Sequence, residues 1–133
     1  MSSEFIIGIL KEALTHYLDS NFCIHFSFLN QFKKMARQQN TDRNGFAWSE
    51  PTKRAVWQRG SMIPEFSPDV WRRDKCGKVM LWTEHGNRNA ETGWEIDHIN
   101  PVANGGNDNL DNLQPLTWKN NTDKGDSLYW SCP

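Results

Sequence analysis

The most constraining feature of this chain is the order of short elements near its C-terminal end. Residues 94–99 read Trp-Glu-Ile-Asp-His-Ile, which is typical of a short strand. Two asparagines and two glycines at 104–107 predict a loop, because these residues favour turn geometries. Residues 113–116 predict a second short strand, and residues 117–124 predict a helix that opens with Thr117 as N-cap. The order strand, loop, strand, helix predicts one small unit of mixed structure.

Five polar side chains along this unit carry chemistry. Asp97 supplies a hard carboxylate oxygen suited to Mg²⁺ or Mn²⁺, and the adjacent His98 is of the residue type that can serve as a general base near neutral pH. Asn112 can hold a loop or an imidazole by hydrogen bonding. Asn121 offers an amide oxygen from the helix, and Lys124, one turn later, suits a phosphate. Each residue alone has an ordinary structural explanation, since a His beside an Asp is more often a structural pair. Their ordered combination is much rarer by chance.

This segment resembles the HNH endonucleases. The match consists of Asp97-His98-Ile99 with Pro101, Gly105-Gly106, Asn112-Leu113-Gln114-Pro115-Leu116, and Asn121 with Lys124-Gly125. The run from Trp71 to Gly77 is similar to the entry segment of many such proteins, which extends the resemblance to residues 48–126. The resemblance implies an α+β fold, with a small ββα-metal core and short flanking helices and strands.

The resemblance also implies a function: metal-dependent hydrolysis of phosphodiester bonds in DNA. His98 would act as the general base, and Asn112 would orient it and brace the loop. Asp97 and Asn121 would hold one divalent cation, with Mg²⁺ or Mn²⁺ expected. Charge alone suggests which residues follow the nucleic-acid backbone. These are Arg72, Arg73, Lys75, Arg88 and Lys124.

The chain departs from the family where many members bind a structural zinc through two cysteine pairs. Thr117 and Asn120 stand where the second pair would fall, and Cys76 alone remains near the first. We therefore expect no structural zinc. Glu95 lies two residues before Asp97 and shares its strand face. An exposed strand position is expected for Glu95 ahead of a supporting role at the metal.

A length of 133 residues suits one domain, perhaps with a short extension. The sequence divides into an N-terminal helical extension at 1–34, a polar linker at 35–47, and a nuclease domain at 48–133. Within the extension, residues 4–18 fit an amphipathic helix and residues 22–28 a short strand. Two alternatives stay open for the extension: a dispensable segment before a start at Met35, or a helical cap on the core.

Shorter signals place the elements upstream of the motif. Ser49 and Pro51 predict the start of a helix that continues over 52–59. Residues 78–82 predict a strand. The seven tryptophans are expected in the core before any base-stacking role is considered.

Charge and cysteine content limit the function classes. The net charge of −1 excludes a uniformly polybasic binder, but residues 1–32, 33–88 and 89–133 carry −2, +6 and −5. A basic platform beside a carboxylate-rich metal site explains this asymmetry, and so do two solvated faces that balance each other. The three cysteines are far apart and form no C-x-x-C pair. They predict a reducing compartment, hence a cytoplasmic protein, rather than a disulfide scaffold.

No segment reaches the ~20 apolar residues of a membrane-spanning helix, so no membrane partner is expected. The expected partner is nucleic acid, DNA ahead of RNA. The oligomeric state stays open, because a homodimer would cut both strands and a monomer would nick one. Two other classes remain alongside the nuclease. One is a nucleic-acid-binding module on the same fold without catalysis, and the other is a structural protein that docks through residues 1–32.

Overall fold

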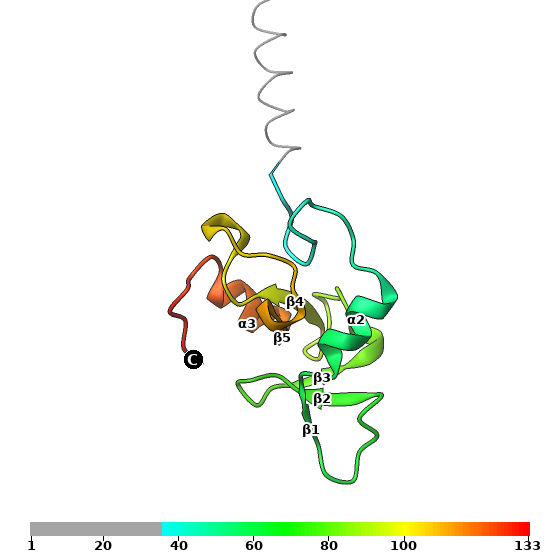
Figure 1. Cartoon of the computed structure of the whole chain (residues 1–133). Coiled ribbons are helices and arrows are strands. Elements are labelled where there is room, and N and C mark those ends of the chain that lie inside the picture. The colour runs from blue at the N-terminus through cyan, green and yellow to red at the C-terminus, as the bar shows by residue number, and fades with distance from the viewer. Residues whose placement is uncertain (1–35) are drawn as a thin grey trace, which may run out of the picture. The chain divides into compact units, whose positions relative to one another are not determined.

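The strand–loop–strand–helix unit is present as the sequence predicts (Figure 1). Strands β4 (Trp94–His98) and β5 (Leu113–Thr117) pair antiparallel, with Asp97 opposite Gln114. Helix α3 (Trp118–Lys124) follows β5 directly and packs against both strands. The structure is a computed structural model that describes residues 36–133. The fold of this part is mixed α and β, with small sheets and two helices, as the α+β prediction requires.

The second helix and a second sheet precede this unit. Helix α2 (Glu50–Trp57) begins two residues earlier than expected, with the predicted Ser49 as N-cap and Pro51 in the first turn. Strands β1 (Ser61–Met62), β2 (Trp71–Arg73) and β3 (Val79–Leu81) form an antiparallel sheet in the order β1-β2-β3. The strand expected over 78–82 is β3. The sequence did not predict β1 and β2, because strands of two or three residues are too short to show a period.

Tryptophans fill the space between α2 and the strands. Trp57 of α2 and Trp94 of β4 are both buried, with ring centroids 5.0 Å apart. Trp82 packs against both of them from the side. Two of the buried indole N–H groups have carbonyl partners, since Trp57 donates to Pro68 at 2.8 Å and Trp94 to Trp82 at 3.2 Å, whereas that of Trp48 has none among residues 36–133. The core prediction for Trp57 and Trp94 is confirmed.

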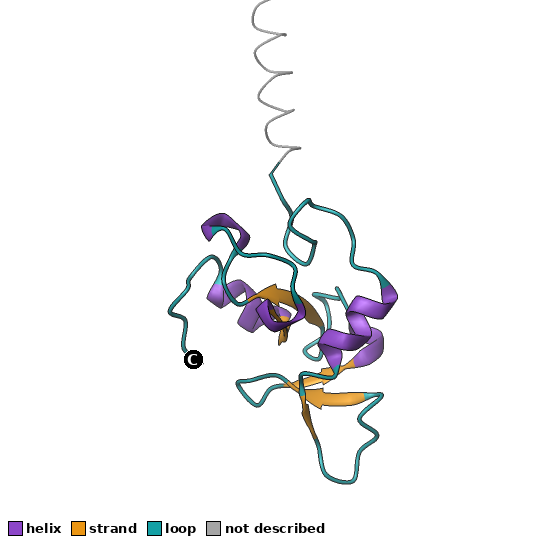
Figure 2. Cartoon of the chain, viewed as in Figure 1, coloured by secondary structure: helices purple, strands orange, loops and turns teal. Residues whose placement is uncertain are grey.

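Of the linker expected at 35–47, residues 37–47 belong to the same compact unit as the rest of the domain, Arg37–Pro133. Asn40 has a left-handed backbone, with φ of 59°. Its side-chain oxygen accepts the N–H of Ile96 at 2.9 Å and Nε2–H of His85 at 3.1 Å. The segment therefore satisfies an edge donor of β4. Figure 2 shows that loops of this kind make up much of the path between the short regular elements.

The helix expected over 4–18, the strand expected over 22–28, and Cys23 lie outside the described residues. Within residues 36–133, neither helix has the length and apolar character needed to cross a membrane.

Candidate active site

Strand β4 and helix α3 place their polar side chains against each other. Glu95 and Asp97 alternate with core residues along β4 and share one face of it. Asn121 and Lys124 are one helical turn apart on α3 and meet that face. The Nδ2 atom of Asn121 donates to Glu95 Oε2 at 2.6 Å, and Lys124 Nζ lies 3.2 Å from Asp97 Oδ1. All four side chains are buried, so each depends on its partner.

Asp97 is held on both of its oxygens. Gln114, its register partner on β5, donates to Oδ2 at 2.8 Å. Lys124 contacts Oδ1 and also donates to the carbonyl of His98 at 2.9 Å. Burial raises the pKa of Asp97, while the hydrogen bond from Gln114 and the charge of Lys124 oppose that rise. A further positive charge beside this carboxylate would favour its ionised form.

Glu95 fixes the orientation of the Asn121 amide. The sequence favoured an exposed Glu95, and this prediction is wrong, since its relative exposure is 2%. Arg88 neutralises it through an ion pair, with Nε 2.6 Å from Oε1. Because Glu95 accepts the N–H of Asn121, the amide oxygen Oδ1 points away from the strand. Within residues 36–133 this oxygen accepts no hydrogen bond, and it is not sealed from solvent.

His98 is held in one orientation by an acidic loop residue. Its side chain is 3% exposed, and Nε2 lies 2.7 Å from Asp108 Oδ1. Since a carboxylate only accepts, Nε2 carries the proton. Nδ1 has no hydrogen-bond partner in the described part of the chain, and it is not fully sealed from solvent. Trp48 packs on the ring, with centroids 5.6 Å apart.

Asn112 braces the loop that carries Asp108. Its side-chain Nδ2 donates to the carbonyls of Asn100 and Asn107, at 3.1 and 2.8 Å, and its Oδ1 accepts the N–H of Asn100 at 2.8 Å. In the same loop a Cβ on Gly106 would lie 1.8 Å from the Asn100 carbonyl oxygen, so only glycine fits there. The imidazole of His98 contacts Asp108, and no hydrogen bond joins it to Asn112 among residues 36–133.

A small cavity lies where these side chains converge. Its volume is about 30 Å³, the share of one water molecule in the liquid. Asp97, His98 and Asn121 line it together with Arg37, which adds a guanidinium to its wall. Residues 36–133 hold no cluster of three or more His, Cys, Asp or Glu suited to a metal. The oxygens of Asp97 and Asn121 are nevertheless the hard ligands that Mg²⁺ and Mn²⁺ take, and Mg²⁺ usually keeps several waters. The donor set therefore fits such a cation.

The five cations expected on nucleic acid have different surroundings. Lys124 is buried and committed to Asp97, and Arg88 is committed to Glu95. Arg72 donates to carbonyl oxygens of Pro68, Gln58 and Gly60, so its guanidinium has a structural role. Arg73 and Lys75 are exposed. Lys124 is therefore the least accessible to a phosphate, while Arg72 and Arg88 are held by structural partners although the Arg88 side chain is 44% exposed.

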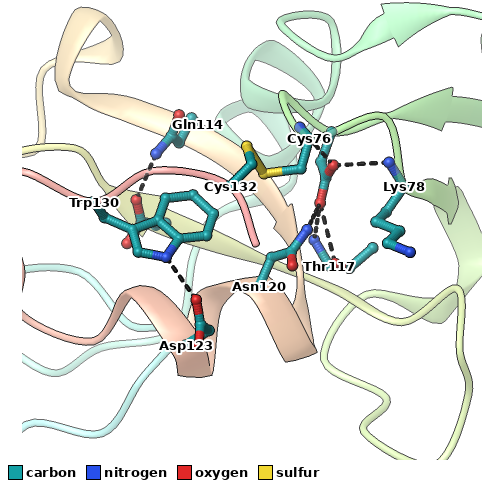
Figure 3. Close-up of a disulfide and its surroundings, with 10 residues drawn as sticks. Cys76, Lys78, Gln114, Thr117, Asn120, Asp123, Trp130 and Cys132 are labelled. Carbon is teal, nitrogen blue, oxygen red and sulfur yellow. Dashed lines mark hydrogen bonds between the residues drawn. A yellow bond between two sulfur atoms is a disulfide. The ribbon is translucent and has the colours of Figure 1, made fainter.

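A buried carboxylate, Asp74, joins the elements behind the site. Its Oδ1 accepts the backbone N–H groups of Cys76 and Lys78, at 2.9 and 3.0 Å. Its Oδ2 accepts the N–H and hydroxyl of Thr117 and the side-chain amide of Asn120, at 3.1, 3.0 and 2.8 Å. Thr117 is the N-cap of α3 as predicted, but its hydroxyl donates to Asp74 instead of capping. These bonds, most of whose donors are labelled in Figure 3, fix the start of α3 and thus the position of Asn121.

A disulfide lies beside the Asp74 junction, between Cys76 and Cys132 (Figure 3). The prediction that these cysteines are unpaired is wrong. Their separation of 56 residues hides the pairing in the sequence, while the fold brings their Cα atoms to 5.5 Å. Trp130, close by in the C-terminal segment, donates from its indole to Asp123 at 2.7 Å. Because disulfides persist mainly in oxidising compartments, the inference of a reducing compartment loses its basis.

Sequence reasoning missed Asp108 and Asp74 and undervalued Glu95. The polar run Asn-Asp-Asn at 107–109 signals a turn and does not indicate which residue it would meet. Asp74 lies in the entry segment, where its local bonds to Cys76 and Lys78 give no sign of its distant partners Thr117 and Asn120. The one available signal was for Glu95, whose spacing from Asp97 puts both carboxylates on one face.

Comparison with known proteins supports the motif. Residues 75–127 match the family model described as HNH endonuclease. The matched segment contains Asp97, His98, Asn112 and Asn121, and it confirms the resemblance and indicates a function of nuclease type. No curated protein and no solved structure matches the chain.

Proposed function

We propose that this chain, whose residues 75–127 match the HNH endonucleases, is a metal-dependent endonuclease that hydrolyses phosphodiester bonds in DNA. The observation that carries the proposal is the environment of His98. Asp108 holds its Nε2–H at 2.7 Å, Nδ1 has no partner among residues 36–133, and His98 lines the same cavity as Asp97 and Asn121. A neutral imidazole with one fixed and one free nitrogen is the form that a general base requires.

In the proposed mechanism, Nδ1 of His98 takes a proton from the water that attacks the phosphorus. Asp108 stabilises the imidazolium that forms, because its carboxylate accepts a hydrogen bond from the protonated Nε2. Asp97 and Asn121 would hold the divalent cation through one carboxylate and one amide oxygen. When bound, it would supply charge stabilisation for the phosphate and the departing 3′ oxygen. Asn112 would keep the loop in the conformation that brings Asp108 to His98.

A plasmid-cleavage assay tests the proposal. Supercoiled plasmid is incubated with the full chain in Mg²⁺, Mn²⁺ or EDTA. We expect metal-dependent nicking or linearisation, reduced at least ~10²-fold in His98→Ala, which is the usual scale for loss of a general base. Asp97→Ala should abolish both cleavage and cation binding. His85→Gln is the matched control, since it replaces a histidine that does not line the cavity. Cleavage by His98→Ala at the wild-type rate would exclude this mechanism.

One contact favours a second candidate, a nucleic-acid-binding module without catalysis. Lys124 already places a positive charge 3.2 Å from Asp97, where the cation would otherwise act. Calorimetric titration with Mn²⁺ separates the two candidates. Binding that is lost in Asp97→Ala supports the nuclease, and DNA binding with no cation uptake and no cleavage supports the module.

A further inference from the structure

A second, larger hollow is lined in part by Gln114. Its volume is about 170 Å³, room for several water molecules. Arg59 and Lys75 line it with their cationic side chains, and Ile99 and Pro115 contribute apolar surface. It combines positive charge with apolar surface in one concavity.

The two cationic side chains of this hollow form no ion pair among residues 36–133. Arg59 and Lys75 are both exposed. Lys75 Nζ lies over the Trp130 ring, 5.5 Å from its centre, a cation–π contact that does not neutralise its charge. By contrast, Arg88 and Lys124 are neutralised by buried carboxylates.

The hollow lies directly beside the candidate active site. Gln114 lines it and also donates to Oδ2 of Asp97 at 2.8 Å. Ile99, another lining residue, follows His98 in the chain. A polymer bound at His98 and Asp97 would therefore have this hollow within reach of its neighbouring units.

We propose that this hollow binds the sugar–phosphate backbone of the DNA next to the bond that is cut. Arg59 and Lys75 contact the phosphate, and the exposed Ile99 packs against the sugar. Cations and amides that contact phosphate position a nucleic acid without reading its sequence. This inference rests on the proposed nuclease function and adds to it the surface that holds the substrate in register.

Binding of a 20-base-pair DNA duplex in EDTA tests the hollow separately from cleavage. We expect Arg59→Ala with Lys75→Ala to weaken binding about 10-fold at 0.1 M salt. The slope of log affinity against log salt should fall by about 1.8, because each phosphate contact contributes about 0.9. Lys78→Ala is the matched control, since it removes one exposed charge that does not line the hollow. Arg59→Lys with Lys75→Arg keeps both charges and should retain most of the slope.

The outcomes separate the two proposals. An unchanged salt slope in the double alanine variant, with its melting temperature also unchanged, overturns the hollow as a phosphate site. If that variant cleaves and binds like the wild type, the nuclease proposal survives and the hollow fails. If the wild type cuts no plasmid but the variant loses the expected slope, the hollow stands and the nuclease proposal fails. If inorganic phosphate at millimolar concentration displaced the bound duplex as well as unlabelled duplex does, that result would overturn the recognition of a polymer at this hollow.

Discussion

Asp108 Oδ1 lies 2.7 Å from His98 Nε2, and the backbone N–H of Arg43 donates to the same carboxylate at 3.0 Å. The segment expected to be a linker thus supports the residue that orients the candidate base. Asp108 lies ten positions after His98 in the chain, and Asn112 fixes the intervening loop from its far end. The base is therefore positioned by a chain of contacts that starts outside the motif.

Replacing Asp108 by Asn should reduce cleavage about 10²-fold while DNA binding in EDTA is retained. An amide at this position can donate to Nε2 and favour the tautomer with the proton on Nδ1, which cannot accept one from water. Single-turnover cleavage and the ¹⁵N shifts of the imidazole measure rate and tautomer together. Asp111→Asn removes an exposed carboxylate of the same loop and should leave both unchanged. Wild-type rates in Asp108→Asn would argue that loop packing alone orients His98.

Replacing Glu95 by Gln should lower Mn²⁺ affinity by ~10–100-fold, the usual effect of removing a group that orients a ligand. The new amide can turn its NH₂ toward Asn121, so that the oxygen of Asn121 is no longer fixed toward the cavity. Calorimetry measures the affinity without relying on cleavage. Glu91→Gln, an exposed carboxylate paired with Lys119, is the control and should bind Mn²⁺ like the wild type. Equal affinity in Glu95→Gln would show that the carboxylate only balances Arg88.

Replacing Cys132 by Ser should lower the free energy of unfolding by up to about 4 kcal/mol, since the disulfide closes a loop of 57 residues in the unfolded chain. Urea unfolding with and without dithiothreitol measures it. Reductant should lower the midpoint of the wild type and leave that of Cys132→Ser unchanged. Cys23→Ser keeps both partners and should respond to reductant like the wild type. A wild-type midpoint that ignores reductant would contradict a contribution from this bond.

Acid should destabilise the protein through His85. Burial is the main cause that lowers its pKa from 6.5 to about 4, and the charge of Lys53 lowers it further. Between these values the unfolded chain binds more protons than the folded one. Stability is therefore present above pH 6.5 and is lost as the pH falls toward 4. Because the ring is partly exposed, we expect a loss of about 1–2 kcal/mol, less than the full shift would give.

Unfolding of His85→Gln from pH 7 to pH 4 isolates this effect. The glutamine keeps a donor for Asn40 and removes the titration. As the pH falls, the free energy of unfolding of the wild type should decrease by about 1–2 kcal/mol more than that of the variant. A difference that stays constant with pH would show that His85 does not cause the acid sensitivity.

The elements of the ββα core were predictable because their signals are local. The strand at Trp94–His98, the strand at Leu113–Thr117 and the helix ending before Gly125 each follow from residues within the element. Gly125 has a φ of 51°, and its N–H bonds the carbonyl of Asn121, as a residue that ends a helix should. Local periodicity and turn residues are enough to predict these three elements without any tertiary information.

Several contacts that hold the site were not predictable, because the two residues of each lie far apart in the chain. Nothing near Asp74 in the sequence indicates that it meets Thr117, 43 residues later. The same holds for Arg43 and Asp108, which are 65 residues apart. The family pattern gives the positions of His98 and Asp97, and only the fold shows which charges neutralise and orient them.

The Asp74 junction has a consequence for the order of events when the protein matures. All five donors that meet this carboxylate belong to the chain itself, so the start of α3 is fixed as soon as folding is complete. The amide of Asn121 is then already in position, whether or not a cation is bound. Little of the binding energy of an arriving ion would be used to organise the helix, so its uptake would reflect the affinity of a ready-made site. Under the proposed function, the cation would then bind and leave without unfolding the protein, and activity would follow the supply of metal while the fold persists.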